Sequence, residues 1–152
     1  MKCITCYCWK EIEMNRSLLQ KLAEQFYRAI IKARPEFAKR DRMANFPGGC
    51  CDDASDLFGY YLLQKFDIAS KQCNGRYEDG NPENTTNHVW LLVKGTIVDL
   101  TYGQFHLGAT IYVGNENSFY RSLNDKVVQE NYNIENSKRL WTDYQKILKY
   151  IE

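Results

Sequence analysis

The chain contains a small set of residues that could carry out nucleophilic chemistry. It has six cysteines and two histidines among 152 residues, so any reaction that needs an imidazole has to use His88 or His106. The apolar pattern predicts a helix from about Cys51 to Lys65, which places Cys50 and Cys51 at its first turn. Because the unpaired N–H groups at a helix start stabilise a thiolate, either cysteine is a candidate nucleophile.

Some residues around these two cysteines favour a reactive thiolate and others oppose it. Gly49 has no side chain and would let a substrate carbonyl come close to the thiol, so it is a candidate substrate-binding residue. Asp52 and Asp53 suit the positive end of a helix, yet they disfavour a further negative charge nearby. On a helix they project away from Cys51 in other directions, which limits this effect.

A nucleophilic thiol also needs a base, and the base needs a group that fixes its tautomer. The segment around Lys94-Gly95 predicts a β-hairpin, in which a two-residue turn would place Trp90 opposite Asp99. His88 lies two residues from Trp90, so His88 and Asp99 would share one face as diagonal neighbours about 7–8 Å apart. A three-residue turn would put them on opposite faces, so the register tests this pairing.

The other elements follow from apolar spacing and turn residues. Apolar residues at helical spacing predict a helix from Ser17 to Ile31, with a capping box at Ser17 and Gln20. Further along, the sequence predicts a loop at 45–49, an exposed polar loop at 74–87, a β-prone run at 109–113 and a helix at 138–150. This order predicts an α+β fold, with N-terminal helices and the nucleophile helix packed on an antiparallel sheet.

Three segments together resemble a known superfamily. They are Phe46-Pro-Gly-Gly-Cys-Cys-Asp-Asp-Ala-Ser, His88-Val-Trp-Leu-Leu-Val and Ile97-Val-Asp-Leu-Thr-Tyr-Gly-Gln-Phe. Their order is similar to that of the papain-like superfamily in its transglutaminase-like (Cys-His-Asp) branch, over residues 45 to 105. The Gly-Gly-x-Cys approach also resembles arylamine N-acetyltransferases. That likeness implies Cys51 as the nucleophile, with Cys50 as the alternative.

The resemblance implies roles for the remaining site residues. His88 would take the thiol proton, and Asp99 would orient the imidazole. Asn45 stands six residues before Cys51, the offset of the oxyanion-hole side chain in papain-like enzymes. Trp90 would wall the site or belong to the core.

The implied chemistry is acyl transfer through a thioester, without a cofactor or metal ion. The acyl group would go to water, as in a cysteine peptidase or deamidase, or to an amine, as in a transglutaminase or acyltransferase. The substrate would be a peptide, a protein side-chain amide or a small acyl compound.

Two other functions remain open at this stage. One is a non-catalytic binding module of the same fold. The other is a zinc-stabilised interaction domain built on Cys3, Cys6 and Cys8, although a structural zinc site needs a fourth ligand.

Composition sets wider limits on the function. The chain is 44% hydrophobic and 26% charged with a net charge of +1, which predicts one globular domain over 1–152 and does not favour nucleic acid as a partner. No apolar run reaches the ~18 residues of a membrane span, and the N-terminal residues do not match a secretory signal. We therefore expect a cytoplasmic protein, with export by a route that uses no such signal as the alternative.

Overall fold

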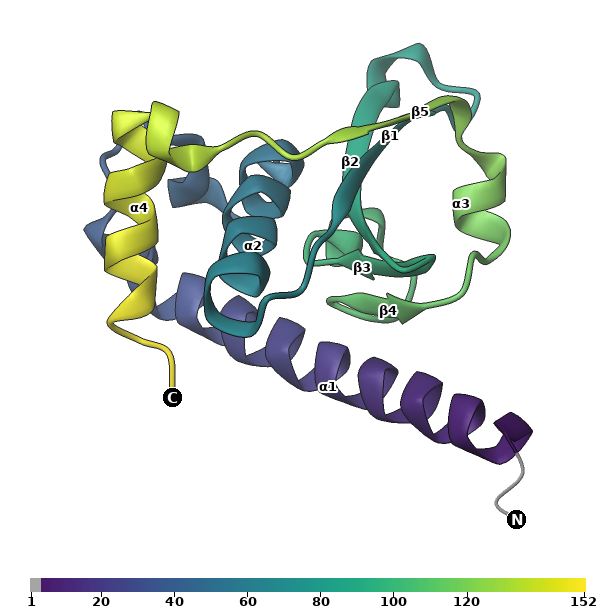
Figure 1. The fold of residues 1–152 in the computed structure, drawn as a ribbon. Coiled ribbons are helices and arrows are strands. Elements are labelled where there is room, and N and C mark those ends of the chain that lie inside the picture. The colour runs from purple at the N-terminus through teal and green to yellow at the C-terminus, as the bar shows by residue number, and fades with distance from the viewer. Residues whose placement is uncertain (1–3) are drawn as a thin grey trace.

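The computed structural model describes the backbone of residues 4–152 and the side chains of residues 16–152. Within this part of the chain the fold is α+β, with four α-helices and a five-stranded antiparallel sheet of order β4-β3-β2-β1-β5 (Figure 1). The helices are α1 (Ile4–Ala33), α2 (Cys51–Phe66), α3 (Ser118–Ser122) and α4 (Lys138–Leu148). The strands are β1 (Lys71–Tyr77), β2 (Thr86–Val93), β3 (Thr96–Asp99), β4 (Tyr112–Gly114) and β5 (Asn124–Glu130).

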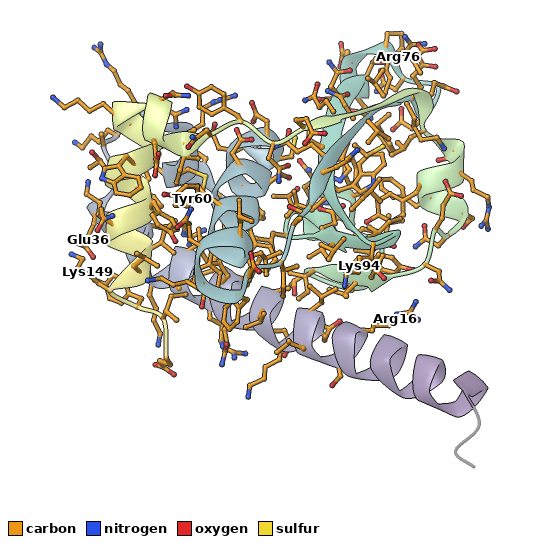
Figure 2. The ribbon with its side chains drawn as sticks, in the orientation of Figure 1. Arg16, Glu36, Tyr60, Arg76, Lys94 and Lys149 are labelled. Atoms are coloured by element: carbon orange, nitrogen blue, oxygen red, sulfur yellow. The ribbon has the colours of Figure 1, made fainter. Side chains whose placement is uncertain are left out.

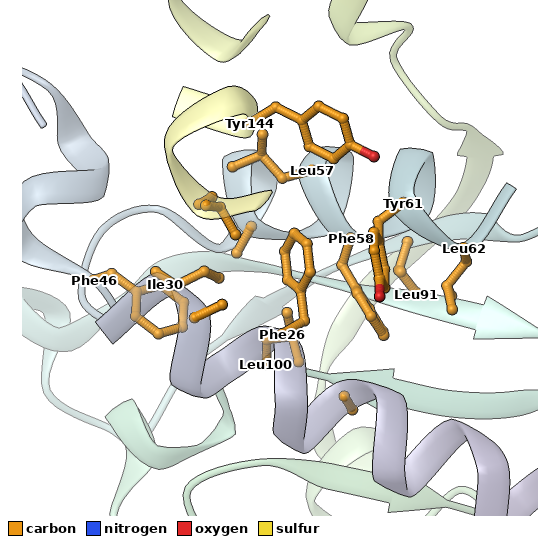
Figure 3. Packing of buried hydrophobic residues seen from close by; sticks show 14 of the residues in the cluster. Phe26, Ile30, Phe46, Leu57, Phe58, Tyr61, Leu62, Leu91, Leu100 and Tyr144 are labelled. Atoms are coloured by element: carbon orange, nitrogen blue, oxygen red, sulfur yellow. The ribbon is translucent and has the colours of Figure 1, made fainter. Parts of the chain in front are cut away.

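The sheet separates two hydrophobic clusters. Helices α1, α2 and α4 lie to one side of it and α3 lies to the other (Figure 1). In the larger cluster the ring of Phe26 packs 5.1 Å from Phe58 and 5.0 Å from Tyr61 between α1 and α2 (Figure 3). The smaller cluster contains Trp90 and Tyr120 and packs against the opposite face. Successive residues of β2 contribute alternately to the two clusters, as the period of a strand requires.

Two helix predictions have different outcomes. The helix predicted from about Cys51 to Lys65 is confirmed, since α2 begins at Cys51 and ends at Phe66. The predicted start at Ser17 is wrong, because α1 already begins at Ile4 and Ser17 lies inside it. Glu11, Glu13 and Met14 are strong helix formers, so the helix continues upstream of the apparent capping box. Although α1 has 30 residues, no helix in the described part of the chain is long and apolar enough to cross a membrane.

The predicted exposed loop at 74–87 is partly wrong. Residues 74–77 belong to β1 and residues 86–87 to β2, which leaves a shorter connection between these strands. Strand β1 contains Asn74 and Gly75, which have low β propensity, but it pairs with β2 on one side and β5 on the other. A Cβ at Gly75 would lie 3.0 Å from Leu123 and 3.2 Å from Trp90, so packing requires a glycine there.

The β-prone run and the final helix are present, and their observed ends differ from the predicted ones by a few residues. The β-prone run at 109–113 corresponds to β4 at Tyr112–Gly114, and the final helix ends at Leu148 rather than at residue 150. Strand β5 and helix α3 were not predicted. All seven residues of β5 are exposed, so its sequence carries no buried stripe that would indicate a strand.

The hairpin of β2 and β3 has the predicted register. Leu91 pairs with Val98 and Val93 with Thr96, around a two-residue turn at Lys94 and Gly95. Lys94 has φ 49° and Gly95 φ 82°, the positive values of a type I′ turn. Lys94 is labelled beside the sheet in Figure 2. His88 and Asp99 therefore project from the same face, as the two-residue turn predicts.

We expect Gly95→Ala to lower the free energy of unfolding by about 1–2 kcal/mol, because an alanine is strained at the positive φ that this turn requires. No atom lies within 4 Å of the new Cβ, so the loss comes from its left-handed backbone conformation. Urea unfolding followed by circular dichroism measures it. Gly48→Ala is the matched control, because its Cβ would meet only a carbonyl oxygen at 3.7 Å. Equal stabilities for the two variants would contradict the prediction.

Candidate active site

The first turn of α2 presents a thiol at an uncapped helix start. Cys50 is the N-cap residue, and its carbonyl oxygen accepts the N–H of Ala54 at 2.9 Å, but its side chain makes no capping hydrogen bond. Cys51 is the first helical residue and is partly exposed, with its Sγ 3.9 Å from the carbonyl oxygen of Asn87. The thiol of Cys51 thus lies at the positive end of α2 and beside the start of β2.

The two adjacent thiols differ in their burial. Cys50 is fully buried in the larger cluster. Burial, followed by the negative charge of Asp53, raises the pKa of Cys50 to about 12. A buried thiol with so high a pKa is a poor nucleophile. Cys51 is therefore the better placed of the two candidates.

The loop that leads into α2 is anchored to the core. The ring of Phe46 is fully buried, and the guanidinium group of Arg34 donates to its carbonyl oxygen at 2.7 Å. Gly49 is exposed, with open space where a Cβ would stand. The backbone next to the thiol of Cys51 is therefore accessible on this side. Asn45 is exposed and its carbonyl oxygen accepts the N–H of Gly48, but no described contact links its side chain to Cys51.

Two arginines offset the carboxylates of this first turn. Arg42 lies 3.1 Å from Asp52 and 2.8 Å from Asp53. Arg139, on α4, contacts the other oxygen of Asp53 at 2.8 Å. Because Asp53 is buried and paired twice, its charge is compensated locally and opposes a thiolate at Cys51 less than the sequence suggests.

His88 and Asp99 form a buried pair. The Nε2 atom of His88 lies 2.6 Å from Oδ2 of Asp99, and both side chains are essentially inaccessible to solvent. The same oxygen accepts the hydroxyl of Tyr120 at 2.8 Å. The other oxygen accepts the backbone N–H of Thr101 at 3.0 Å and its hydroxyl at 3.3 Å. Asp99 thus accepts four hydrogen bonds, two at each of its carboxylate oxygens.

The surroundings of His88 favour its protonated form. Burial by itself lowers the pKa of an imidazole. The charge of Asp99 and its hydrogen bond outweigh burial, and the nearby thiol of Cys51 adds to their effect, so the pKa of His88 rises to about 9. Cys51 is therefore close enough to His88 to influence its protonation.

Aromatic rings surround the imidazole of His88. Trp90 stacks with it at 5.5 Å between ring centroids, and Phe105 meets it edge-on at 4.7 Å. Phe119, on α3, lies at 6.1 Å. Trp90 is only 2% exposed, so the structure places it within the smaller cluster against His88 rather than on an open surface. These rings fix the plane of the imidazole.

The structure thus brings Cys51, His88 and Asp99 together from α2, β2 and β3. Three residues at this site were not predicted from the sequence: Tyr120 and Thr101, which donate to Asp99, and Gln104, whose Nε2 lies 3.2 Å from Nδ1 of His88. Thr101 had a local signal, because an Asp side chain commonly accepts the N–H two residues ahead. Tyr120 comes 21 residues after Asp99 and no local pattern connects them. His106 is exposed at the end of the short 3-10 helix η4 (Tyr102–Phe105).

The zinc hypothesis concerns Cys3, Cys6 and Cys8, which lie outside the described side chains. Among residues 16–152, no group of three or more histidine, cysteine, aspartate or glutamate side chains is arranged to hold a metal ion.

No family model, curated protein or solved structure matches this chain. Its described residues form an α+β fold in which α2 packs on β2 of an antiparallel sheet. Any functional assignment depends on the geometry around Cys51 and His88.

Proposed function

We propose that the protein is a thiol-dependent acyl-transfer enzyme with a Cys51-His88-Asp99 triad, and that its fold belongs to the papain-like superfamily in the transglutaminase-like branch. One observation carries the proposal: a buried His88–Asp99 pair at 2.6 Å, with the Cys51 thiol next to the imidazole at a helix start. A nucleophile, a base and a group that orients the base are the parts that thiol acyl transfer needs.

The proposed reaction proceeds in two steps. Nδ1 of His88 takes the proton of the Cys51 thiol, since Nε2 is already occupied by Asp99. The sulfur attacks the substrate carbonyl carbon, and the carbonyl electron pair moves to oxygen. When the oxyanion collapses, the C–N bond breaks and the Nδ1 proton passes to the leaving nitrogen. A thioester on Cys51 remains, and the amine or ammonia leaves.

The second step removes the acyl group from Cys51. Neutral His88 takes a proton from water or from an amine, which attacks the thioester carbon, and the sulfur leaves and regains its proton. Water gives hydrolysis, as in a peptidase or deamidase, and an amine gives a new amide. Both routes use carbonyl substrates such as a peptide, a protein side-chain amide or a small acyl compound, and neither needs a cofactor.

The helix start supplies the stabilisation that the oxyanion requires. The backbone N–H of Cys51 lies in the first turn of α2, where N–H groups have no partner within the helix. The accessible backbone at Gly49 gives a substrate room to approach this donor. One oxyanion donor is worth about 10²–10³-fold in rate in well-studied enzymes.

The test is selective alkylation with iodoacetamide at about pH 6, followed by peptide mapping. An isolated thiol is only ~0.3% thiolate at that pH, so we expect Cys51 to react about 100-fold faster than Cys73 if His88 holds it as an ion pair. Cys51→Ala should abolish the fast phase. Cys73→Ala is the matched control, because Cys73 is buried in the smaller cluster and should leave that phase unchanged.

The ion-pair mechanism also requires the imidazole of His88. His88→Gln should remove the excess reactivity of Cys51 while the protein stays folded by circular dichroism. Uniform slow labelling of the thiols in the folded wild-type protein would contradict the proposal and favour a non-catalytic binding module.

A further inference from the structure

The imidazole of His88 is held at both of its ring nitrogens. Nε2 contacts Asp99, and Nδ1 lies 3.2 Å from Nε2 of Gln104. Gln104 belongs to η4, five residues after Asp99. Nδ1 is also the nitrogen that exchanges a proton with Cys51 in the proposed reaction. The partner of Nδ1 therefore bears directly on the chemistry of the site.

A second contact fixes which end of the Gln104 carboxamide faces His88. Nε2 of Gln104 also lies 3.3 Å from Oγ1 of Thr101. The hydroxyl of Thr101 gives its only proton to Asp99, so its oxygen can only accept from Gln104. An amide NH₂ group has two hydrogens, one for Thr101 and one for Nδ1 of His88. The network therefore orients the nitrogen of Gln104, and not its oxygen, toward the imidazole.

This orientation favours one tautomer of neutral His88. A donor at Nδ1 fits only an imidazole whose Nδ1 carries no proton, which places the proton on Nε2, where Asp99 accepts it. The four side chains then close a ring of hydrogen bonds: Gln104 donates to Thr101 and His88, and both of these donate to Asp99. Every polar hydrogen within this ring has an acceptor.

We propose that Gln104 is a positioning residue that stabilises the neutral, Nε2-protonated form of His88 relative to the imidazolium and so strengthens the imidazolium as an acid toward the leaving nitrogen. The role rests on the proposed function. The Gln104–Nδ1 hydrogen bond breaks when Cys51 gives its proton to Nδ1, and it forms again when that proton passes to the leaving nitrogen. Gln104 thus stabilises the state that follows proton delivery.

Other groups around His88 act in the opposite direction. Asp99 on β3 and Cys51 on α2 favour the protonated imidazole, and Tyr120 on α3 reaches His88 only through Asp99. The remaining neighbours in contact with the ring are aromatic and carry no charge. Gln104 is therefore the neighbour that moderates the effect of Asp99, which keeps neutral His88 available as the base of the second step.

The test is a pH titration of ¹⁵N-histidine-labelled protein by NMR, which reports the protonation of each ring nitrogen. The chain has only two histidines, so a His106→Gln variant assigns the signals of His88. In Gln104→Met, which keeps the side-chain length without a donor, we expect the pKa of His88 to rise by about 0.5–1. Gln104→Glu should raise it further. Gln145→Met, on the exposed face of α4, is the matched control and should change nothing.

The titration separates this proposal from the proposed function. We would repeat it in a Cys51→Ser background, where the difference between Gln104 and Met should persist because it requires no thiol. An unchanged pKa and tautomer of His88 in Gln104→Met would overturn the role of Gln104 even if Cys51 is reactive. If Cys51 fails the alkylation test, a raised pKa in that variant still supports the hydrogen bond from Gln104 to Nδ1 of His88, while the proposed function falls.

Discussion

The Asp99→Asn variant is expected to lose about 10²–10⁴-fold in the rate of the proposed acyl transfer and most of the excess reactivity proposed for Cys51. Asp99 accepts four hydrogen bonds from three residues, His88, Tyr120 and Thr101. An asparagine offers one acceptor oxygen and turns an NH₂ group toward donors on its other side. His88 would lose both the negative charge and the group that fixes its tautomer, and burial would then drive it toward the neutral form.

The same variant is expected to alter the pH dependence of stability. The folded-state pKa of His88 is about 9, above the usual 6.5, so its pairing with Asp99 stabilises the fold fully below pH 6.5. That contribution is lost as pH rises through 9. The difference in unfolding free energy between wild type and Asp99→Asn should therefore be largest below pH 6.5 and smaller above pH 9.

Two measurements check these effects: the second-order rate constant of iodoacetamide with Cys51 at about pH 6, and urea unfolding at about pH 6 and about pH 10. Asp125→Asn is the matched control, since Asp125 is exposed and pairs with Arg76 at the surface. Exposed pairs contribute only about 0–1 kcal/mol, so the control should be close to wild type. Wild-type reactivity of Cys51 in folded Asp99→Asn would exclude the proposed triad.

Replacing Trp90 with Ala is expected to lower the free energy of unfolding by about 3–5 kcal/mol. The indole is 2% exposed, stacks on His88 and packs 5.1 Å from the ring of Tyr120. Gly75 on β1 leaves space for this ring, since a Cβ there would lie 3.2 Å from the indole. The imidazole of His88 would also lose a neighbour that fixes its plane.

Thermal unfolding measures this loss. For a chain of this size, each kcal/mol corresponds to about 2–4 °C, so the midpoint should fall by roughly 10 °C. Trp141→Ala is the matched control, because Trp141 is 38% exposed and should cost much less. Equal midpoints for the two variants would show that Trp90 is not the structural centre of the smaller cluster. Trp90→Phe should recover part of the stability by restoring an aromatic contact with His88.

The sequence alone predicted the parts of the site that depend on local rules. Apolar spacing located α2 with Cys51 at its start, and this element is continuous along the chain. The Lys94-Gly95 turn determined the hairpin register, because a two-residue turn leaves only one parity for His88 and Asp99. These predictions succeeded because each interaction involved residues close in sequence.

Only the tertiary structure decided the rest. The sequence could not choose between Cys50 and Cys51 from the helix start alone, since their different burial depends on how α2 packs against α1 and the sheet. It could not place Tyr120 on Asp99 or recognise β1, because both depend on partners distant in the chain. Helix α2 and the shared face of His88 and Asp99 on the hairpin are thus local properties of this sequence. The protonation of His88 is a tertiary property, because burial and the charges and donors around the ring arise only when the three elements are packed together.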